Sequence, residues 1–479
     1  MESTNQRSYI SAKEMIAFGA SYGGQGMSAN IIASYLTYFF VNVFNINAKA
    51  VSVVLAIEGI WDTINDPLMG SIVDKTRTRW GKLRPFLLGV PIPAALTTIL
   101  FFAGPVIVGN LLPASPVKIA YMTVTYFLWE TFYTAADVSF WGMSAAVSPN
   151  PKDRTKIITI SRMVSSFVGG VPNYIIPVIL DLVNAGILQT SIRSAFSVYG
   201  TATGIVGMLL FSLTGFIVKE RIPQSSDEPS FKDCIKSFFT NRPLRLLLLK
   251  EILGALGNLG APFVNYYNID VLGMASYAVI AGIPATFTSA AGFACVPWFK
   301  RRFNNKQNMI FQKAFGVTLS LLKFVICIGK RRFARLGFML PYLIVEATVS
   351  GFMAPITLIL PTEMIAETVD YSEWTTGKRN EGIAFSAMAF ASKISGTLSR
   401  AVGTWLIPVI GYRTSNDAVR VIQSAKTQRR IFEMTTIIPT ALGLASFIPM
   451  FMYDLVGEKR ERMYSELEQM RAALSEQQN

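Results

Sequence analysis

The sequence predicts an all-α membrane protein with about twelve transmembrane helices in two six-helix halves. Three observations lead to this fold class. Hydrophobic side chains make up 51% of the 479 residues and charged ones only 15%, whereas soluble proteins carry about 25% charged residues. The mean hydropathy is +0.40. Finally, long apolar stretches recur along the chain with polar breaks between them, which excludes a single soluble core or a disordered chain.

Each apolar stretch is long enough to cross a bilayer as a helix that satisfies its own backbone hydrogen bonds. The longest polar break separates six stretches from six, which is typical of a transporter with a site between its halves. We therefore expect an N-terminal half over 1–218, a central cytoplasmic loop over 219–242 and a C-terminal half over 243–456. The approximate stretches are 14–42, 50–72, 85–108, 118–147, 156–181, 194–218, 243–269, 276–299, 308–328, 336–362, 381–410 and 431–456.

The distribution of charge predicts the orientation. Lys and Arg collect in the breaks after the second, fourth, sixth and eighth stretches, and such breaks face the cytoplasm. We expect a multi-pass protein of the inner or plasma membrane with both termini cytoplasmic. Basic breaks at 330–335 and 413–430 depart from the alternation. The charged tail over 457–479 has apolar residues at helical spacing, which predicts a cytoplasmic amphipathic helix.

Residue types that are missing or rare narrow the class of protein. The chain has no histidine, and its three cysteines have no metal-binding spacing, so the commonest catalytic base and the usual zinc ligands are lacking. We expect no enzyme and no cofactor. Basic cytoplasmic loops explain the net charge of +14. We therefore expect the protein to contact lipid and not nucleic acid. We also expect a monomer.

The second stretch carries three carboxylates. Glu58, Asp62 and Asp66 are spaced by four, which places them on one helix face. Such groups repel each other unless a cation or protons lie between them, and hard cations favour oxygen ligands. Asn65 adds an amide oxygen, so the pattern predicts a Na⁺ site. The alternative is that Asp66 and Asp74 cap the helix end or pair with arginines of the following break.

The fourth stretch places a carboxylate between aromatic rings. Tyr133, Asp137 and Trp141 share one face, and this combination suits a sugar, whose hydroxyls donate to the acid while the rings offer an apolar wall. An aromatic packing stripe would explain the rings but not a buried Asp137. Two further charges, Arg162 and Lys393, lie in apolar stretches. A buried lysine needs a partner or a water-filled path, so Lys393 either pairs with a carboxylate of the second stretch or contacts the substrate.

Charges of alternating sign occur in two breaks. The break over 367–382, ETVDYSEWTTGKRNEG, contains acids and bases in turn, and the break after the second stretch does the same. Opposite charges at cytoplasmic helix ends can close a gate in one state and release it in another, although a solvated loop is an equal alternative. The candidate gate residues are Asp74, Arg77, Arg84, Glu367, Asp370 and Arg379.

Two motifs now resemble a known family. WDTINDPLMGSIVDKTRTRWGKLRPFLL (61–88) and AETVDYSEWTTGKRNEGIAFSAMAFASK (366–393) are similar to the signatures of the glycoside–pentoside–hexuronide:cation symporters, the melibiose permease family of the major facilitator superfamily. The resemblance implies uptake of a sugar or glycoside, coupled to Na⁺, Li⁺ or H⁺ by alternating access. A lipid transporter or scramblase on the same fold, or a membrane sugar sensor, is the alternative.

The resemblance also implies roles for individual residues. Its cation ligands fall on Asp62, Asp66, Asn65 and Thr134. Its substrate residues fall on Asp137, Tyr133, Trp141, Arg162 and Lys393. The family's second sugar-binding aspartate, on the first helix, falls by spacing at Gly26, with Gln25 beside it. Because one carboxylate is therefore missing, a galactoside is in doubt, an acidic sugar fits at least as well, and Gln25 becomes a candidate substrate contact.

Overall fold

The structure is a computed structural model, and it describes all residues except 1–8, 149, 222–240, 378–380, 415–420 and 479. The described residues form helices, turns and one isolated bridge between Thr78 and Gly81, with no strand among them. This confirms the predicted helical class. The chain divides into two compact units, which we describe separately: Met1–Ser226 with Thr404–Ile422, and Asp227–Gly403 with Gln423–Asn479.

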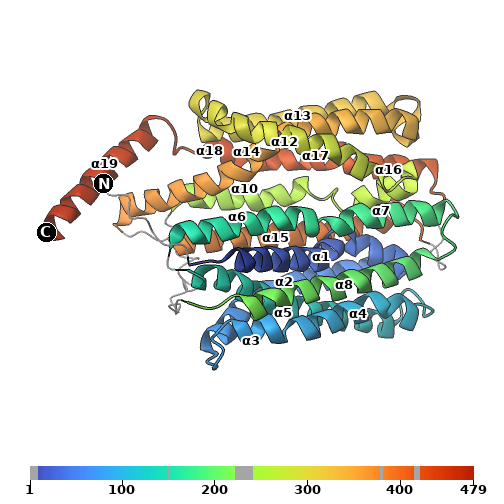
Figure 1. The fold of residues 1–479 in the computed structure, drawn as a ribbon. Coiled ribbons are helices and arrows are strands. Elements are labelled where there is room, and N and C mark those ends of the chain that lie inside the picture. Colours follow the sequence, from blue (N-terminus) through green and yellow to red (C-terminus); the bar gives the residue numbers. More distant parts are fainter. Residues whose placement is uncertain (1–8, 149, 222–240, 378–380, 415–420, 479) are drawn as a thin grey trace. The chain divides into compact units, whose positions relative to one another are not determined.

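Helices of the first unit begin and end where the sequence provides caps and breaks (Figure 1). At the start of the first helix, Ser11 and Glu14 form a reciprocal capping box, which satisfies two backbone N–H groups. The stretches at 85–108 and 156–181 each form two consecutive helices. The elements are α1 (Ala12–Tyr38), η1 (Phe39–Val43), α2 (Ala48–Lys75), α3 (Arg84–Gly89), α4 (Pro91–Ile107), α5 (Pro116–Ala146), α6 (Pro151–Val168), α7 (Val171–Asn184) and α8 (Ile192–Ile217).

The second unit contains the remaining elements, and the end of the long helix α15 belongs to the first unit. Irregular turns interrupt the stretches at 243–269 and 431–456. The elements are α10 (Arg242–Gly257), α11 (Phe263–Tyr266), η2 (Tyr267–Leu272), α12 (Tyr277–Arg302), α13 (Asn305–Ile328), η3 (Gly329–Ala334), α14 (Leu336–Thr376), α15 (Glu381–Val409), α16 (Ala425–Thr435), α17 (Ile437–Gly443), η4 (Leu444–Ser446), α18 (Phe447–Met452) and α19 (Glu458–Gln478).

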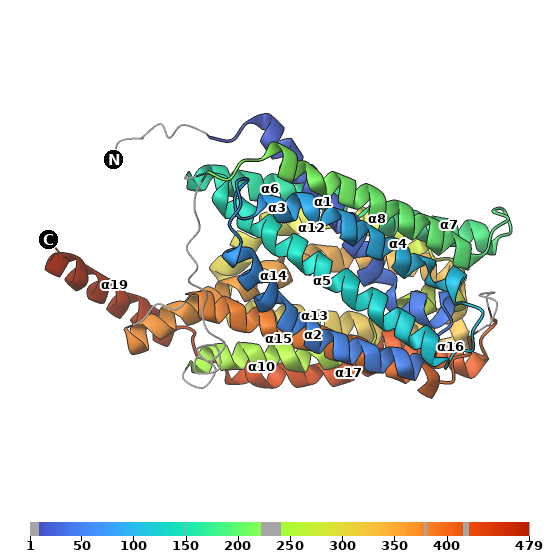
Figure 2. The same ribbon diagram turned by 90° about the horizontal axis from the view of Figure 1, so that it is seen from below.

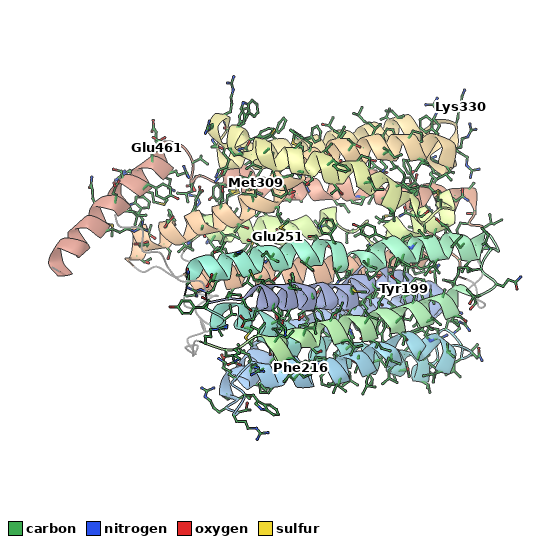
Figure 3. The ribbon with its side chains drawn as sticks, in the orientation of Figure 1. Tyr199, Phe216, Glu251, Met309, Lys330 and Glu461 are labelled. Carbon is green, nitrogen blue, oxygen red and sulfur yellow. The ribbon has the colours of Figure 1, made fainter. Side chains whose placement is uncertain are left out.

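The surface of the described helices is apolar, as a bilayer requires. Large hydrophobic side chains project outward from both units, and Phe216 on α8 is 67% exposed (Figure 3). Seven helices among the described residues are long and apolar enough to cross a membrane by length and composition. The number of twelve spans stays a prediction.

The first unit is held together by close packing of α1 against α6 and α8 (Figure 1). At Gly24 a side chain would place its Cβ 2.3 Å from the carbonyl oxygen of Gly207, so the two backbones touch only because both residues are glycines. One turn earlier, the Ser21 hydroxyl donates to the carbonyl of Leu210 at 3.1 Å and accepts from the N–H of Thr214. These contacts fix the rotation of α1 and therefore the direction of its polar side chains.

Candidate functional site

Helices α2 and α5 begin at the same end of the first unit. The N–H of Asn47, just before α2, donates to the carbonyl of Pro113, just before α5, at 3.0 Å. Close by, the buried ammonium of Lys118 donates at 3.1–3.2 Å to the backbone carbonyls of Asn45, Gly109 and Leu111. Because both helices leave this anchored corner and pack along each other, they run parallel (Figure 2).

A tryptophan fixes the register between these helices. The Trp61 indole N–H donates to the Thr131 hydroxyl at 3.2 Å, and its ring stacks on Phe127 with centroids 6.1 Å apart. Asn65 and Thr134 each lie about one helical turn beyond this bond. Since the helices are parallel, the register places Asn65 and Thr134 at the same depth. The two neutral ligands implied by the resemblance therefore lie along one helix interface.

Asn65 is fully buried, and within the described residues neither its amide oxygen nor its amide nitrogen has a hydrogen-bond partner. Buried polar groups are almost always paired, and leaving an amide unpaired costs about 1–3 kcal/mol on protein mutational scales. Thr134 is buried as well. An orphaned amide oxygen between Asp62 and Asp66 in the chain fits the oxygen-rich set that a hard cation favours.

The carboxylates of α2 differ in exposure. Glu58 is buried, whereas Asp62 and Asp66 are only partly buried. No group of three or more Asp, Glu or Cys side chains in the described part of the chain is placed to hold a metal ion. A cation at this position would therefore rest on one or two carboxylates together with neutral oxygens, and not on three carboxylates.

Gln25 contacts the acid of the predicted sugar site. The fully buried amide nitrogen of Gln25 on α1 donates to Oδ1 of Asp137 on α5 at 2.7 Å. Its amide oxygen has no hydrogen-bond partner among the described residues. The pair therefore combines a carboxylate with an unsatisfied amide acceptor, and both groups can accept hydrogen bonds from the hydroxyls of a sugar.

Aromatic rings surround this pair. Tyr22 packs edge-on against Trp141, with centroids 5.1 Å apart, and the Arg162 guanidinium lies over the Trp141 ring at 5.1 Å. Tyr133 stacks on Trp129, with centroids 5.0 Å apart. The predicted residues of α5 and α6 are thus brought together. Tyr22 was missed by sequence reasoning, although its position three residues before Gln25 places it on the same side of the helix.

Position 26, where spacing places the family's second sugar-binding aspartate, faces α6 and not Asp137. A Cβ at Gly26 would lie 2.9 Å from the hydroxyl oxygen of Ser165 and 3.1 Å from the Cα of Gly169, both next to α1 on the α6 side. An aspartate side chain would collide there instead of reaching Asp137. Gln25 occupies the position that approaches Asp137. Lys393 lies on α15 in the second unit, and its role stays a prediction.

The predicted pairing of Asp74 with arginines is also corrected. The Asp74 carboxylate forms an ion pair with Lys82. Arg77 donates to the backbone carbonyls of Asp74 and Thr76 at 2.5 and 3.0 Å, and Arg84 donates from Nε to the carbonyl of Gly215 at 3.0 Å. Both guanidinium groups thus donate to backbone carbonyls, while Lys82 neutralises the carboxylate. The proposed gating role of these residues stays a prediction.

Glu220 holds the turn before α3. Its carboxylate accepts from the backbone N–H groups of Lys82, Leu83 and Arg84 at 2.7–3.0 Å, so it caps α3. Gly81 precedes them with φ +105°, and a Cβ there would lie 2.5–2.6 Å from the Glu220 carboxylate. The positive φ favours glycine at this position, and a Cβ would also push the Glu220 carboxylate away from the three N–H groups that it caps.

Residues 367–376 are helical, in contrast to the predicted break. Helix α14 runs through Glu367 and Asp370 to Thr376. The acids pair with bases of α19, Glu367 with Arg460 at 2.9 Å and Asp370 with Arg471 at 3.3 Å. Hydrogen bonds from Arg462 of α19 and from the indole of Trp374 of α14 lower the pKa of Glu466 on α19. Arg379 lies outside the described residues.

Comparison with known proteins covers almost the whole chain. A family model described as MFS/sugar transport protein matches residues 17–457. The chain is 24% identical to the isoprimeverose transporter of Lactiplantibacillus pentosus, across 96% of this chain and 92% of the relative. It is 26% identical to a putative glycoside/cation symporter of Escherichia coli, across 98% and 97%. A glucuronide carrier protein homolog of Escherichia coli is 21% identical, across 91% of each chain.

Solved structures support the same fold. A bacterial homolog of the human lysosomal transporter Spinster, in an inward-facing conformation, superimposes with a TM-score of 0.57 over 94% of this chain and 97% of that one, at 14% identity. A variant of the nucleoside transporter NupG superimposes with a TM-score of 0.60 over 92% and 100%, at 13% identity. At such identities the likeness concerns the fold alone.

Proposed function

The chain belongs to the family of MFS/sugar transport proteins, and we propose that it is a symporter that couples the uptake of a sugar or glycoside to Na⁺ or H⁺. Family membership confirms the resemblance of the 61–88 and 366–393 motifs to glycoside–pentoside–hexuronide:cation symporters. It also confirms that the chain is a membrane transporter and not an enzyme.

The observation that carries the substrate proposal is the Gln25–Asp137 pair inside an aromatic wall. Sugar hydroxyls donate to the carboxylate and to the unsatisfied Gln25 oxygen, while the sugar ring packs against Trp141 or Tyr133. The names of the relatives support this class, since they include an isoprimeverose transporter and a glycoside/cation symporter. A lipid transporter on the same fold would give the polar pair no role.

The position of Arg162 supports a more specific substrate, a sugar that carries a carboxylate. Its guanidinium lies on Trp141, and Trp141 lies one helical turn beyond Asp137 on the same helix face. A carboxylate on the sugar would pair with Arg162 while the hydroxyls engage Asp137. A glucuronide carrier protein homolog among the relatives supports this arrangement. A neutral glycoside would leave the guanidinium to its cation–π contact.

The coupling ion is proposed to bind along α2 and α5. The proposed ligands are the carboxylate oxygens of Asp62 and Asp66 and the neutral oxygens of Asn65 and Thr134. The buried Asn65 amide without a hydrogen-bond partner among the described residues is the observation that supports this site. Binding of a cation neutralises the carboxylates and orders α5, which also carries Asp137. Only the empty or the fully loaded carrier then exchanges readily between its outward-facing and inward-facing states. Both termini lie in the cytoplasm.

Uptake in proteoliposomes tests this proposal. Asp137→Asn should raise the sugar KM by about ten- to a hundredfold, because a hydrogen bond to a charged group is worth about 1.5–3 kcal/mol. Asp66→Cys should abolish the stimulation of uptake by a Na⁺ gradient. Asp454→Asn is the control, because that residue pairs with Lys459 beyond the last span. Normal kinetics in Asp137→Asn would exclude the proposed sugar site, and unchanged stimulation in Asp66→Cys would exclude Asp66 from the cation site.

A further inference from the structure

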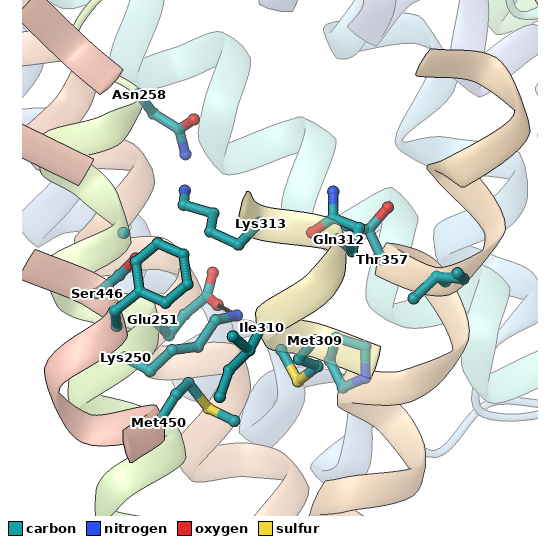
Figure 4. Close-up of a pocket in the computed structure, with 14 residues that line it drawn as sticks. Lys250, Glu251, Asn258, Met309, Ile310, Gln312, Lys313, Thr357, Ser446 and Met450 are labelled. Carbon is teal, nitrogen blue, oxygen red and sulfur yellow. Dashed lines mark hydrogen bonds and ion pairs between the residues drawn. The ribbon is translucent and has the colours of Figure 1, made fainter. Parts of the chain in front are cut away.

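A cavity of about 260 Å³ with a mixed polar and apolar lining lies inside the second unit, between α10, α13, α14 and the η4–α18 segment (Figure 4). Its volume is a little below the roughly 300–1,000 Å³ of ordinary small-molecule pockets. It contains none of the residues of the proposed sugar and cation sites. The cavity is therefore a separate feature that transport through those sites does not explain.

The cationic side of the cavity carries two lysines and one acid. Lys250 pairs with Glu251 at 3.2 Å, and the second oxygen of Glu251 lies 3.4 Å from the Ser392 hydroxyl that donates to it. Lys313 extends from α13 into the cavity, and its ammonium points toward Asn258 (Figure 4). Lys250, Lys313 and Glu251 together give the lining of the cavity a net charge of +1.

Lys313 has no hydrogen-bond or ion-pair partner within the part of the chain that the structure describes. Its ammonium lies beside the close contact of two glycines: a Cβ at Gly257 would lie 3.6 Å from Nζ, and one at Gly443 would lie 3.7 Å away. Ten residues further along α13, Lys323 pairs with Glu346 at 3.0 Å. Lys323 thus has an ion-pair partner, whereas the carboxylate nearest to Lys313 in the cavity, that of Glu251, already pairs with Lys250.

A lone ammonium within apolar helices is costly and is normally paired. Glu251 lines the same cavity, but its single negative charge already pairs with Lys250, so one ammonium of the cavity is left without a counter-charge among the described residues, and a ligand is best placed to supply it. The opposite wall of the cavity is apolar and includes Ile356, Phe447 and Met450. The ligand should therefore carry one anionic group and a compact apolar body.

We propose that this cavity is a binding site for a small monocarboxylate with an apolar body of about the size of one ring. The carboxylate accepts hydrogen bonds from the Lys313 and Lys250 ammonium groups, with the amides of Gln312 and Asn258 as further donors on the cavity wall. The body lies against Phe447 and Met450. Neither the site nor its test depends on the proposed symport of sugar.

Equilibrium dialysis of radiolabelled benzoate against the purified full-length protein in detergent tests the site. We expect saturable binding of about one benzoate per chain. Unlabelled benzamide has the same shape without the charge, and inorganic phosphate has charge without the apolar body. Both should compete at least about tenfold more weakly than unlabelled benzoate, as the loss of a charge-assisted hydrogen bond or of the apolar contact requires.

Two variants locate the binding. Lys313→Gln should weaken benzoate binding by about tenfold or more, whereas Lys426→Gln removes an equal charge from an exposed position on α16 and should leave it unchanged. Unchanged affinity in Lys313→Gln, equal competition by benzamide, or equal competition by phosphate would each overturn the proposal. The benzamide and phosphate comparisons use the unaltered protein, so they decide the question even if Lys313→Gln does not fold.

Discussion

Replacing Asn65 with leucine tests the cation site through stability. The side chain is fully buried and neither amide atom is paired among the described residues, so its burial costs about 1–3 kcal/mol in the absence of a cation. Leucine has a similar volume and no polar atom. Without Na⁺, the Asn65→Leu variant should therefore unfold with a free energy about 1–3 kcal/mol higher than the unaltered protein.

The same substitution should remove the response to Na⁺. A ligand at a hundred times its dissociation constant stabilises the folded state by about 2.7 kcal/mol. If loss of the Asn65 oxygen weakens Na⁺ binding a hundredfold, the ligand concentration equals the new dissociation constant and the stabilisation falls to about 0.4 kcal/mol. One variant is thus expected to be more stable than the unaltered protein without Na⁺ and to respond less to adding it.

Thermal unfolding in detergent, in sodium chloride and in choline chloride of equal ionic strength, measures both effects. Asn268→Leu is a matched control, because Asn268 is also buried with an unpaired amide oxygen but belongs to η2 of the second unit. It should gain stability and keep the full Na⁺ response. A Na⁺ response in Asn65→Leu equal to that of the unaltered protein, or a loss of stability in choline chloride, would refute the reasoning.

Two further substitutions examine the surroundings of the site. Gln25→Ala should raise the sugar KM in the vesicle assay by about tenfold or more. The control is Asn30→Ala, which removes a hydrogen bond to the backbone carbonyl of Gly169 and should leave KM within about twofold. Equal KM values for the two variants would remove Gln25 from the sugar site. Gly81→Ala should lower the unfolding free energy by about 1–3 kcal/mol, because the new Cβ meets Glu220. Gly186→Ala, also at positive φ but with no neighbour within 4 Å, should cost less, and equal losses would show that backbone strain alone matters at Gly81.

Hydropathy predicted the helical class because lipid leaves the backbone few alternatives to a helix. It could not predict the end of α14. The charges from Glu367 to Glu373 indicated a solvated break, but their partners are Arg460 and Arg471 on α19. Arg460 lies 93 residues after Glu367, and Arg471 lies 98 residues after Glu373. A local run of charges therefore does not distinguish a solvated loop from a helix whose charges are paired with those of a helix far away in the sequence.

The candidate site also shows what sequence spacing can and cannot predict. Spacing by four placed the acids of α2, and separately the rings and the acid of α5, on single helix faces, because a face is a local property of a helix. The rotation of α1 is not local: it depends on the contact of Gly24 with Gly207. A shift of one residue turns a side chain by about 100° around the helix axis. Counting along the sequence led to Gly26, which faces Ser165, whereas packing turns Gln25 toward Asp137. The direction of Gln25 therefore depends on the backbone contact that Gly24, the residue just before it, makes with Gly207 of α8.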